Sequence, residues 1–171
     1  SSFGCCRCLC FSVFFLFSGA LSAMPLALRR QRQLCIRELQ CKAPNLVALR
    51  TRDGVVSLSD LVRSSLRLRP DRIPIGEVRG AEALDLLKAW GTGHPGGIGT
   101  IHAGSALGAL RRLEQLIQEA VVTVPRALIA ETVNVIAVLA GRGADRRLSE
   151  LAHVAGLGTS GDYSLSASGD Q

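Results

Sequence analysis

Apolar and polar residues follow a regular pattern from about residue 38 onward, and this pattern predicts alternating helices and strands. In residues 57–68, leucine and valine recur at the spacing of one helix face, with Ser57 or Ser59 as N-cap and Pro70 beyond the end. The predicted helices cover residues 57–68, 81–90 and 105–120, with a short helix after Pro125. The predicted strands cover residues 45–50, 73–78, 98–102 and 133–140, followed by a small hairpin of residues 148–157 and 163–165.

This alternation predicts the fold class. Leu, Ala, Val and Ile supply nearly all the apolar side chains of this region, which is typical of helices packed on a parallel sheet. We therefore expect an α/β fold with a mostly parallel sheet flanked by helices.

Residues 1–36 differ in composition from the rest of the chain and are rich in Cys and Phe. The run LCFSVFFLF at residues 9–17 follows Arg7 and precedes small residues, which is the outline of a secretory signal peptide. Because the chain begins with Ser1 and the remainder has the character of a cytosolic enzyme, we favour a fragment or an incorrect gene-model start over a working export signal. A shorter product that starts at Met24, the only methionine, is also conceivable. A further reading, a small exported or membrane-anchored protein, depends on residues 9–23 alone.

The charge and the cysteines exclude little but favour a cytoplasmic protein. The net charge is +6, yet the arginines are scattered and only 4% of the residues are aromatic, so we do not expect sequence-specific nucleic-acid binding. The six cysteines form neither a CxxC pair nor a zinc pattern, and nothing in the later sequence requires an oxidising compartment.

The stretch RLRPDRIPIGEVRG at residues 67–80 carries the first candidate chemistry. Glu77 follows a short apolar strand, and ligands of doubly wound sheets bind beyond the carboxyl ends of the strands. Its carboxylate could hold hydrated Mg²⁺ or orient an attacking water, and Arg79 could meet phosphate oxygens. The plainer alternative is that Glu77 caps the next helix.

This stretch resembles the Walker B region of the type II/IV secretion ATPase superfamily, and in particular its TrbB-type conjugal-transfer branch. The matching positions are Arg67, Pro70, Asp71, Gly76, Glu77 and Arg79. Pro74 departs from the pattern, because an aliphatic residue is usual there. A proline inside a strand cannot donate a ladder hydrogen bond, so we expect this strand to be locally bent.

A second block, WGTGHPGGIGTIHAG at residues 90–104, resembles the histidine box of the same family. Its glycines permit a close approach of the backbone to a ligand. The resemblance implies that His102 senses the terminal phosphate of ATP and that His94 also lines the nucleotide site. For either histidine alone, an ordinary core or surface position is the plainer reading, and a zinc site lacks a third ligand.

Residues 37–45 resemble the end of the family's acidic box and place Glu38 in it. Relatives begin this box with Ile-Glu-Asp-Thr, whereas residues 33–36 here read QLCI and lack the acidic pair. The resemblance covers roughly residues 37–165, which we expect to be the C-terminal part of a motor domain, followed by a flexible tail at residues 166–171.

The phosphate-binding loop of such motors, GxxxxGK[ST], does not occur in the sequence. Without its backbone N–H groups and its lysine, nothing offsets the charge of a triphosphate. We therefore expect this polypeptide by itself to bind ATP weakly and to hydrolyse it negligibly.

The resemblance as a whole implies part of a RecA-like P-loop NTPase core in a hexameric motor for conjugative DNA transfer or type IV secretion. ATP and Mg²⁺ would be its cofactors, Glu77 and His102 the catalytic residues, and Glu77 the metal ligand. Arg67, Arg79, His94 and Glu38 would contact the nucleotide. Expected partners are identical subunits and inner-membrane secretion proteins, with the ring cytoplasmic and peripheral to the inner membrane. The alternative is a non-catalytic remnant or pseudoenzyme of the same family.

Overall fold

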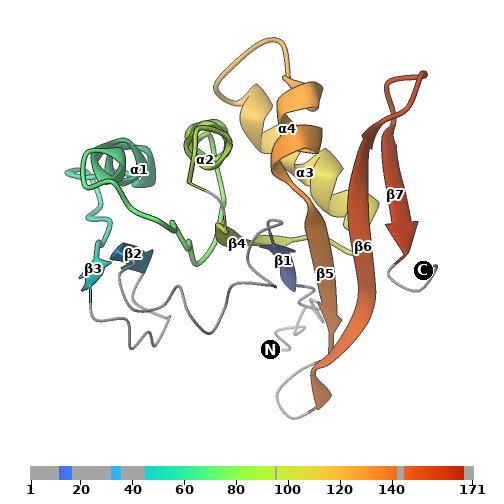
Figure 1. Ribbon diagram of the computed structural model, residues 1–171, viewed down its shortest axis with the longest axis horizontal. Helices are drawn as coiled ribbons and strands as arrows, with labels where there is room; N and C mark the ends of the chain where they lie inside the picture. Colours follow the sequence, from blue (N-terminus) through green and yellow to red (C-terminus); the bar gives the residue numbers. More distant parts are fainter. Residues whose placement is uncertain (1–11, 17–31, 36–44, 95, 142–144, 168–171) are drawn as a thin grey trace, which may run out of the picture.

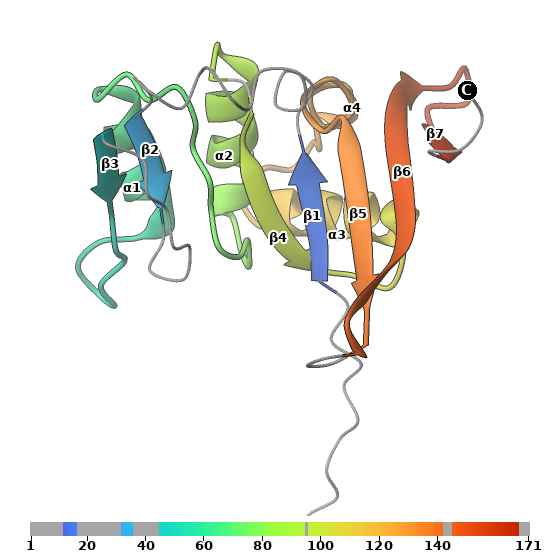
Figure 2. The same ribbon diagram turned by 60° about the horizontal axis from the view of Figure 1, so that its bottom comes forward.

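The computed structural model of the chain describes residues 12–16, 32–35, 45–94, 96–141 and 145–167. These residues form a five-stranded sheet with helices against it and, beside them, a two-stranded sheet next to α1 (Figures 1 and 2). The strands are β1 (Ser12–Leu16), β2 (Arg32–Cys35), β3 (Asn45–Ala48), β4 (Ile98–His102), β5 (Val135–Ala140), β6 (Arg147–Leu157) and β7 (Tyr163–Ala167). The helices are α1 (Leu58–Leu66), α2 (Glu82–Gly91), α3 (Ala106–Gln118) and α4 (Arg126–Thr132).

Local sequence signals account for the helix ends. Ser57 is the N-cap of α1, and Asp60 completes a capping box with it. The Ser105 hydroxyl accepts the Gly108 N–H at the start of α3, and the Glu150 carboxylate on β6 accepts the Ala106 N–H at 2.9 Å. Side chains therefore satisfy N–H groups in the first turn of α1 and of α3, whereas the N-caps of α2 and α4, Ala81 and Pro125, make no side-chain cap hydrogen bond.

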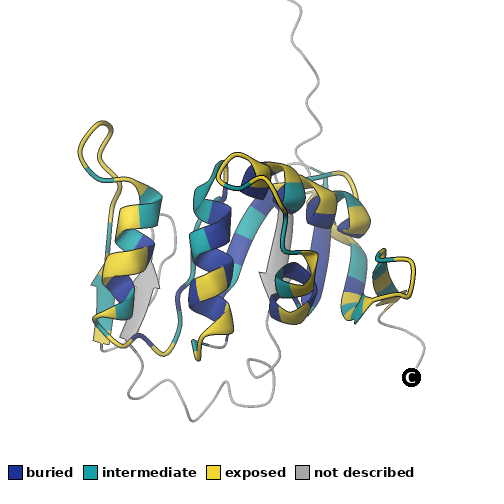
Figure 3. Ribbon diagram, turned by 90° about the horizontal axis from the view of Figure 1, so that it is seen from above, coloured by how far each residue is buried: buried dark blue, intermediate teal, exposed yellow. Residues whose placement is uncertain are grey.

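The core lies between the helices and the five-stranded sheet. The inner faces of α2 and α3 are buried and their outer faces are exposed (Figure 3). α3 packs on β4, β5 and β6, and α2 packs mainly against α1, α3 and α4. Its largest fully buried side chains are Ile73, Leu86, Leu87, Ile101, Leu110, Leu116, Ile117, Ile129, Val133 and Ile136. This packing makes β4 and the segment before α2 a well-supported platform for the polar residues at their ends.

The prediction of a mostly parallel sheet is wrong for the five-stranded sheet. The order of its strands is β4-β1-β5-β6-β7. Each neighbouring pair in it is antiparallel. β4 and β5 are both antiparallel to β1 and so share one direction, and β1, part of the apolar run near the N-terminus, lies between them. The parallel pairing among described residues is β2 with β3 and the single bridge between Pro74 and Ile98.

The strand expected at residues 73–78 is an irregular segment rather than a strand. It runs beside β4, where the Ile75 N–H donates to the Ile98 carbonyl at 2.7 Å and the Val78 N–H to the Thr100 carbonyl at 2.9 Å. Pro74 has no N–H to extend a ladder, which agrees with the bend expected from the sequence. In the described part of the chain, no helix is long and apolar enough to cross a membrane.

Candidate functional site

The carboxylate of Glu77 lies between a cation and an imidazole. Its Oε2 contacts Arg79 Nη2 at 2.5 Å, and its Oε1 contacts His102 Nε2 at 3.1 Å. The Glu77 side chain is 24% exposed, against 78% for Arg79 and 59% for His102. The structure therefore brings together two residues from separate sequence motifs, at the end of the 73–78 segment and at the end of β4.

The pKa of Glu77 is lowered from its ordinary value. The hydrogen bond from Arg79 is the largest cause; partial burial opposes it, and the charges of Arg79 and His102 add to the lowering. Glu77 is therefore a carboxylate at neutral pH. The ionised state is the one that Glu77 needs in order to bind a cation or to orient a water molecule.

Glu82, which the sequence reasoning overlooked, fixes the backbone next to this site. Its Oε1 accepts the N–H groups of Arg79 at 2.8 Å and of Gly80 at 3.0 Å, just before α2 begins. Glu82 therefore fixes the turn that leads into α2, whose N-cap Ala81 has no side-chain cap hydrogen bond. Capping of this helix, the plainer role considered for Glu77, is not seen in the described residues, since the Glu77 carboxylate contacts Arg79 and His102. A glutamate three residues after Arg79, at the start of a helical pattern, was the available signal.

His94 lies in the loop before β4 and is occupied elsewhere. Its Nδ1 donates to the Pro70 carbonyl at 2.6 Å. Nearby, Trp90 Nε1 donates to the Ile73 carbonyl at 3.0 Å, and the indole lies against Gly97. These contacts join the histidine-box loop to the segment that leads to Glu77, so His94 has a structural contact in addition to its predicted nucleotide role.

Two other predicted residues are not brought into this group. Arg67 is exposed at the C-terminal end of α1, where its backbone N–H donates to Ser64; the contacts of the Glu77 carboxylate are with Arg79 and His102. Glu38 lies outside the described residues. The nucleotide contacts expected of both stay predictions.

The carboxylate of Glu77 suits Mg²⁺, which commonly binds proteins through one or two carboxylates and keeps several waters. Among the described residues no group of three or more His, Cys, Asp or Glu side chains is placed to hold a metal, so a site here would be of this sparse type. Arg79 occupies one oxygen of Glu77, so a cation bound there would have to share or replace this contact.

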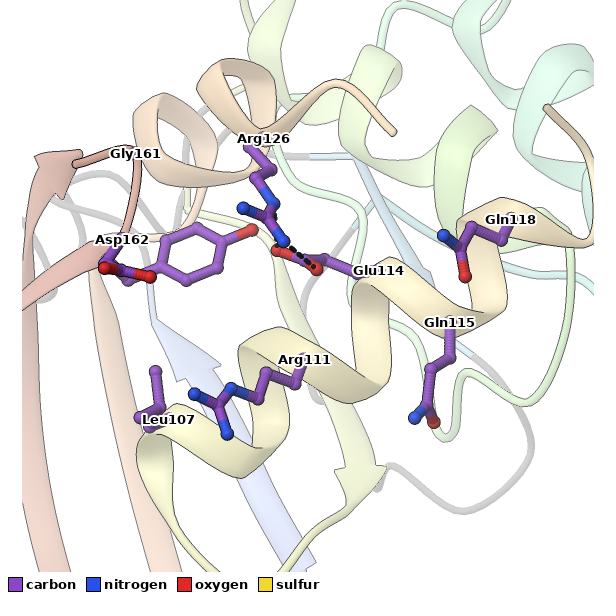
Figure 4. A pocket seen from close by; sticks show the side chains of 9 residues that line it. Leu107, Arg111, Glu114, Gln115, Gln118, Arg126, Gly161 and Asp162 are labelled. Atoms are coloured by element: carbon purple, nitrogen blue, oxygen red, sulfur yellow. Dashed lines mark hydrogen bonds and ion pairs between the residues drawn. The ribbon is translucent and has the colours of Figure 1, made fainter. Parts of the chain in front are cut away.

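A separate hollow of about 560 Å³ lies between α3, α4 and the turn before β7 (Figure 4). At its wall, Arg126 forms a two-point ion pair with Glu114, with distances of 2.9 and 3.1 Å. Burial, and then the Glu114 carboxylate, raise the pKa of Tyr163 above its ordinary value. The opposite charges of this pair offset each other, and the pair links α3 to α4.

Comparisons with known proteins agree on one family. A family model described as "Type II/IV secretion system protein" matches residues 36–147. The conjugal transfer protein TrbB of Rhizobium radiobacter is 51% identical over 119 residues, which are 70% of this chain and 36% of that protein. The type IV secretion system protein PtlH of Bordetella pertussis is 39% identical over 115 residues, 62% of this chain and 34% of that protein.

Solved structures give the same picture. The crystal structure of the VirB11 ATPase from the Brucella suis type IV secretion system, in complex with sulphate, matches with a TM-score of 0.65 and 32% identity. The matched region is 72% of this chain and 40% of the VirB11 chain. The Yersinia pseudotuberculosis ATPase DotB matches in fold, with a TM-score of 0.51 and 21% identity. The chain thus spans little more than a third of the length of the relatives that it matches.

Proposed function

The chain belongs to the type II/IV secretion system protein family, and on this premise we propose that it forms part of a motor for conjugative DNA transfer or type IV secretion. The proposed fold is part of a RecA-like P-loop NTPase core. Its similarity to a TrbB conjugal transfer protein and to the VirB11 ATPase supports this proposal.

The contact between Glu77 and His102 carries the proposal. A carboxylate and an imidazole 3.1 Å apart, presented by two neighbouring segments, can hold Mg²⁺ and meet a phosphate oxygen in one place. In the proposed site Glu77 binds the metal and orients water, and His102 senses the γ-phosphate. Arg79, Arg67, His94 and Glu38 are proposed to contact the nucleotide.

Binding of Mg²⁺ with ATP to the full chain, mapped by NMR, tests this site. We expect weak binding, with a Kd on the order of 1 mM, and signal changes centred on Glu77, Arg79 and His102. Glu77→Gln should abolish these changes, whereas Glu131→Gln, an exposed glutamate on α4, should leave them intact. Signal changes centred elsewhere, or unchanged in Glu77→Gln, would show that the nucleotide site is wrongly placed.

We predict negligible ATP hydrolysis by the 171-residue chain itself, because its sequence holds no GxxxxGK[ST] loop. Turnover of radiolabelled ATP should be the same for the wild-type chain and Glu77→Gln. Turnover clearly above that of the Glu77→Gln variant would contradict this prediction.

The proposed assembly is a ring of six subunits, cytoplasmic and peripheral to the inner membrane, with inner-membrane secretion proteins as partners. The support for this assembly and for these partners is the membership of the family alone. The second candidate is a non-catalytic remnant of the family, favoured by the missing loop and by the missing acidic pair at residues 33–36. Exchanging the aligned 119 residues of the Rhizobium radiobacter protein for those of this chain separates the two, because an active chimera favours the motor.

A further inference from the structure

Thr100 on β4 forms hydrogen bonds on both sides of Glu77. Its hydroxyl donates to the carbonyl of Gly76, the residue before Glu77. Its own carbonyl accepts the N–H of Val78, the residue after Glu77, at 2.9 Å. One residue of β4 therefore holds the backbone that flanks the Glu77 side chain.

The same strand presents His102 two residues further on. Side chains two apart in a strand point to the same face, so Thr100 and His102 lie on one side of β4. The burial of β4 follows this alternation, since Gly99 and Ile101 are buried and His102 is exposed. The hydrogen bonds between Thr100 and residues 76–78 therefore fix the position of Glu77 relative to His102, which lies on the same face of β4.

The segment has few other ties to β4. It is not a ladder strand, and Pro74 contributes no N–H. Apart from the Thr100 bonds, the Ile75 N–H to the Ile98 carbonyl is its described backbone hydrogen bond to β4. The Thr100 hydroxyl thus provides a side-chain bond where a regular strand would use the backbone.

We propose that Thr100 is a positioning residue, which sets the contact between Glu77 and His102 through its bond to Gly76. The relevance of this contact to catalysis rests on the proposed function. The positioning of Glu77 by Thr100 does not depend on that function. A valine has nearly the same shape and no donor, so it leaves the Gly76 carbonyl without its partner. A serine keeps the donor.

NMR of the full chain at one fixed pH, without nucleotide, tests the proposal. Three signals report on it: the side-chain carboxyl carbon of Glu77, Nε2 of His102 and the amide of Val78. In Thr100→Val we expect the chemical shifts of the first two to move toward those of Glu and His side chains that are not in contact. We expect the Val78 amide hydrogen to exchange with solvent about tenfold faster. Thr100→Ser should restore all three.

Thr92→Val is the matched control, because the Thr92 hydroxyl also donates to a backbone carbonyl, that of Lys88, at 2.9 Å on α2. It should lower the melting temperature without moving the three signals. If Thr100→Val does not fold, Thr100→Ala against Thr100→Ser makes the same comparison.

Wild-type signals in the hydroxyl-free variants, or failure of serine to restore them, would overturn the positioning role. This outcome is independent of Mg²⁺ and ATP binding, so failure of the nucleotide proposal is recognised separately.

Discussion

Asp60 and Ser57 exchange hydrogen bonds at the start of α1. The Asp60 carboxylate accepts the Ser57 hydroxyl at 2.6 Å and the Ser57 N–H at 3.1 Å, while the Asp60 N–H donates to the Ser57 hydroxyl oxygen at 3.2 Å. The hydroxyl bond, and then the N–H bond, lower the pKa of Asp60 below its ordinary value of 3.8. Ser57 therefore both marks the start of α1 and lowers the pKa of the Asp60 carboxyl group.

Stability should depend on pH through this group. Because the pKa of Asp60 is lower in the folded than in the unfolded chain, its contribution is complete above the unfolded pKa and is lost as the pH falls through the folded pKa. In Ser57→Ala, we expect the Asp60 pKa, measured from its carboxyl carbon by NMR, to rise toward 3.8. An unchanged titration curve in Ser57→Ala would show that the capping box does not set this pKa.

Contact between α2 and the residue just before β4 depends on the absence of a side chain at Gly97. A Cβ added there would lie 2.2 Å from Trp90 Nε1, and this indole is buried and bonded to the Ile73 carbonyl. A shift of the indole away from an added Cβ would disturb its hydrogen bond to the Ile73 carbonyl. The glycine is therefore required by packing rather than by an unusual backbone angle.

Gly97→Ala should lower the free energy of unfolding by about 1–3 kcal/mol, the usual cost of overpacking a core. Gly104→Ala, at a position with nothing within 4 Å of the added Cβ, is the control and should change stability little. Urea unfolding measures both. Equal stabilities for the two variants would mean that the Trp90 indole gives way easily.

Sequence reasoning succeeded where the deciding signals are local. The bounds of α1, α2 and α3 agree with expectation to within about two residues, because caps and apolar periodicity are short-range properties. It failed for strand direction, since an apolar run such as β5 has the same pattern whether its neighbour is parallel or antiparallel. At the site, family motifs indicated Glu77 and His102. Thr100 lies within the histidine-box block and Glu82 lies three residues after Arg79, but the role of each depends on hydrogen bonds to the backbone of residues 76–80, which sequence patterns do not specify.

At the scale of the whole molecule, β1 joins β4 to the other three strands of the five-stranded sheet, β5, β6 and β7. It pairs with β4 on one side and with β5 on the other along its full length. The sheet is continuous only because residues near one end of the chain enter between strands that lie far from them in sequence. Any loss of backbone bonding in β1 should therefore affect the entire sheet.

A proline in β1 tests this dependence through the backbone alone. We expect Val13→Pro to lower the free energy of unfolding by about 1–3 kcal/mol more than Val13→Ala, because proline removes one N–H from a central strand. Urea unfolding of both variants measures the difference. If the two were equally stable, β1 would not support the sheet.

The long-range pairing of β1 also has a kinetic consequence. Ser12 is paired with His102 and with Leu139, whereas β6 and β7 are joined by a short turn. Pairs distant in sequence form slowly, since the closure of a long loop costs entropy before any contact compensates for it. During refolding, the β6–β7 hairpin should gain protection first and β1 last, so a long-lived intermediate would expose the edges of β4 and β5 and be prone to aggregate.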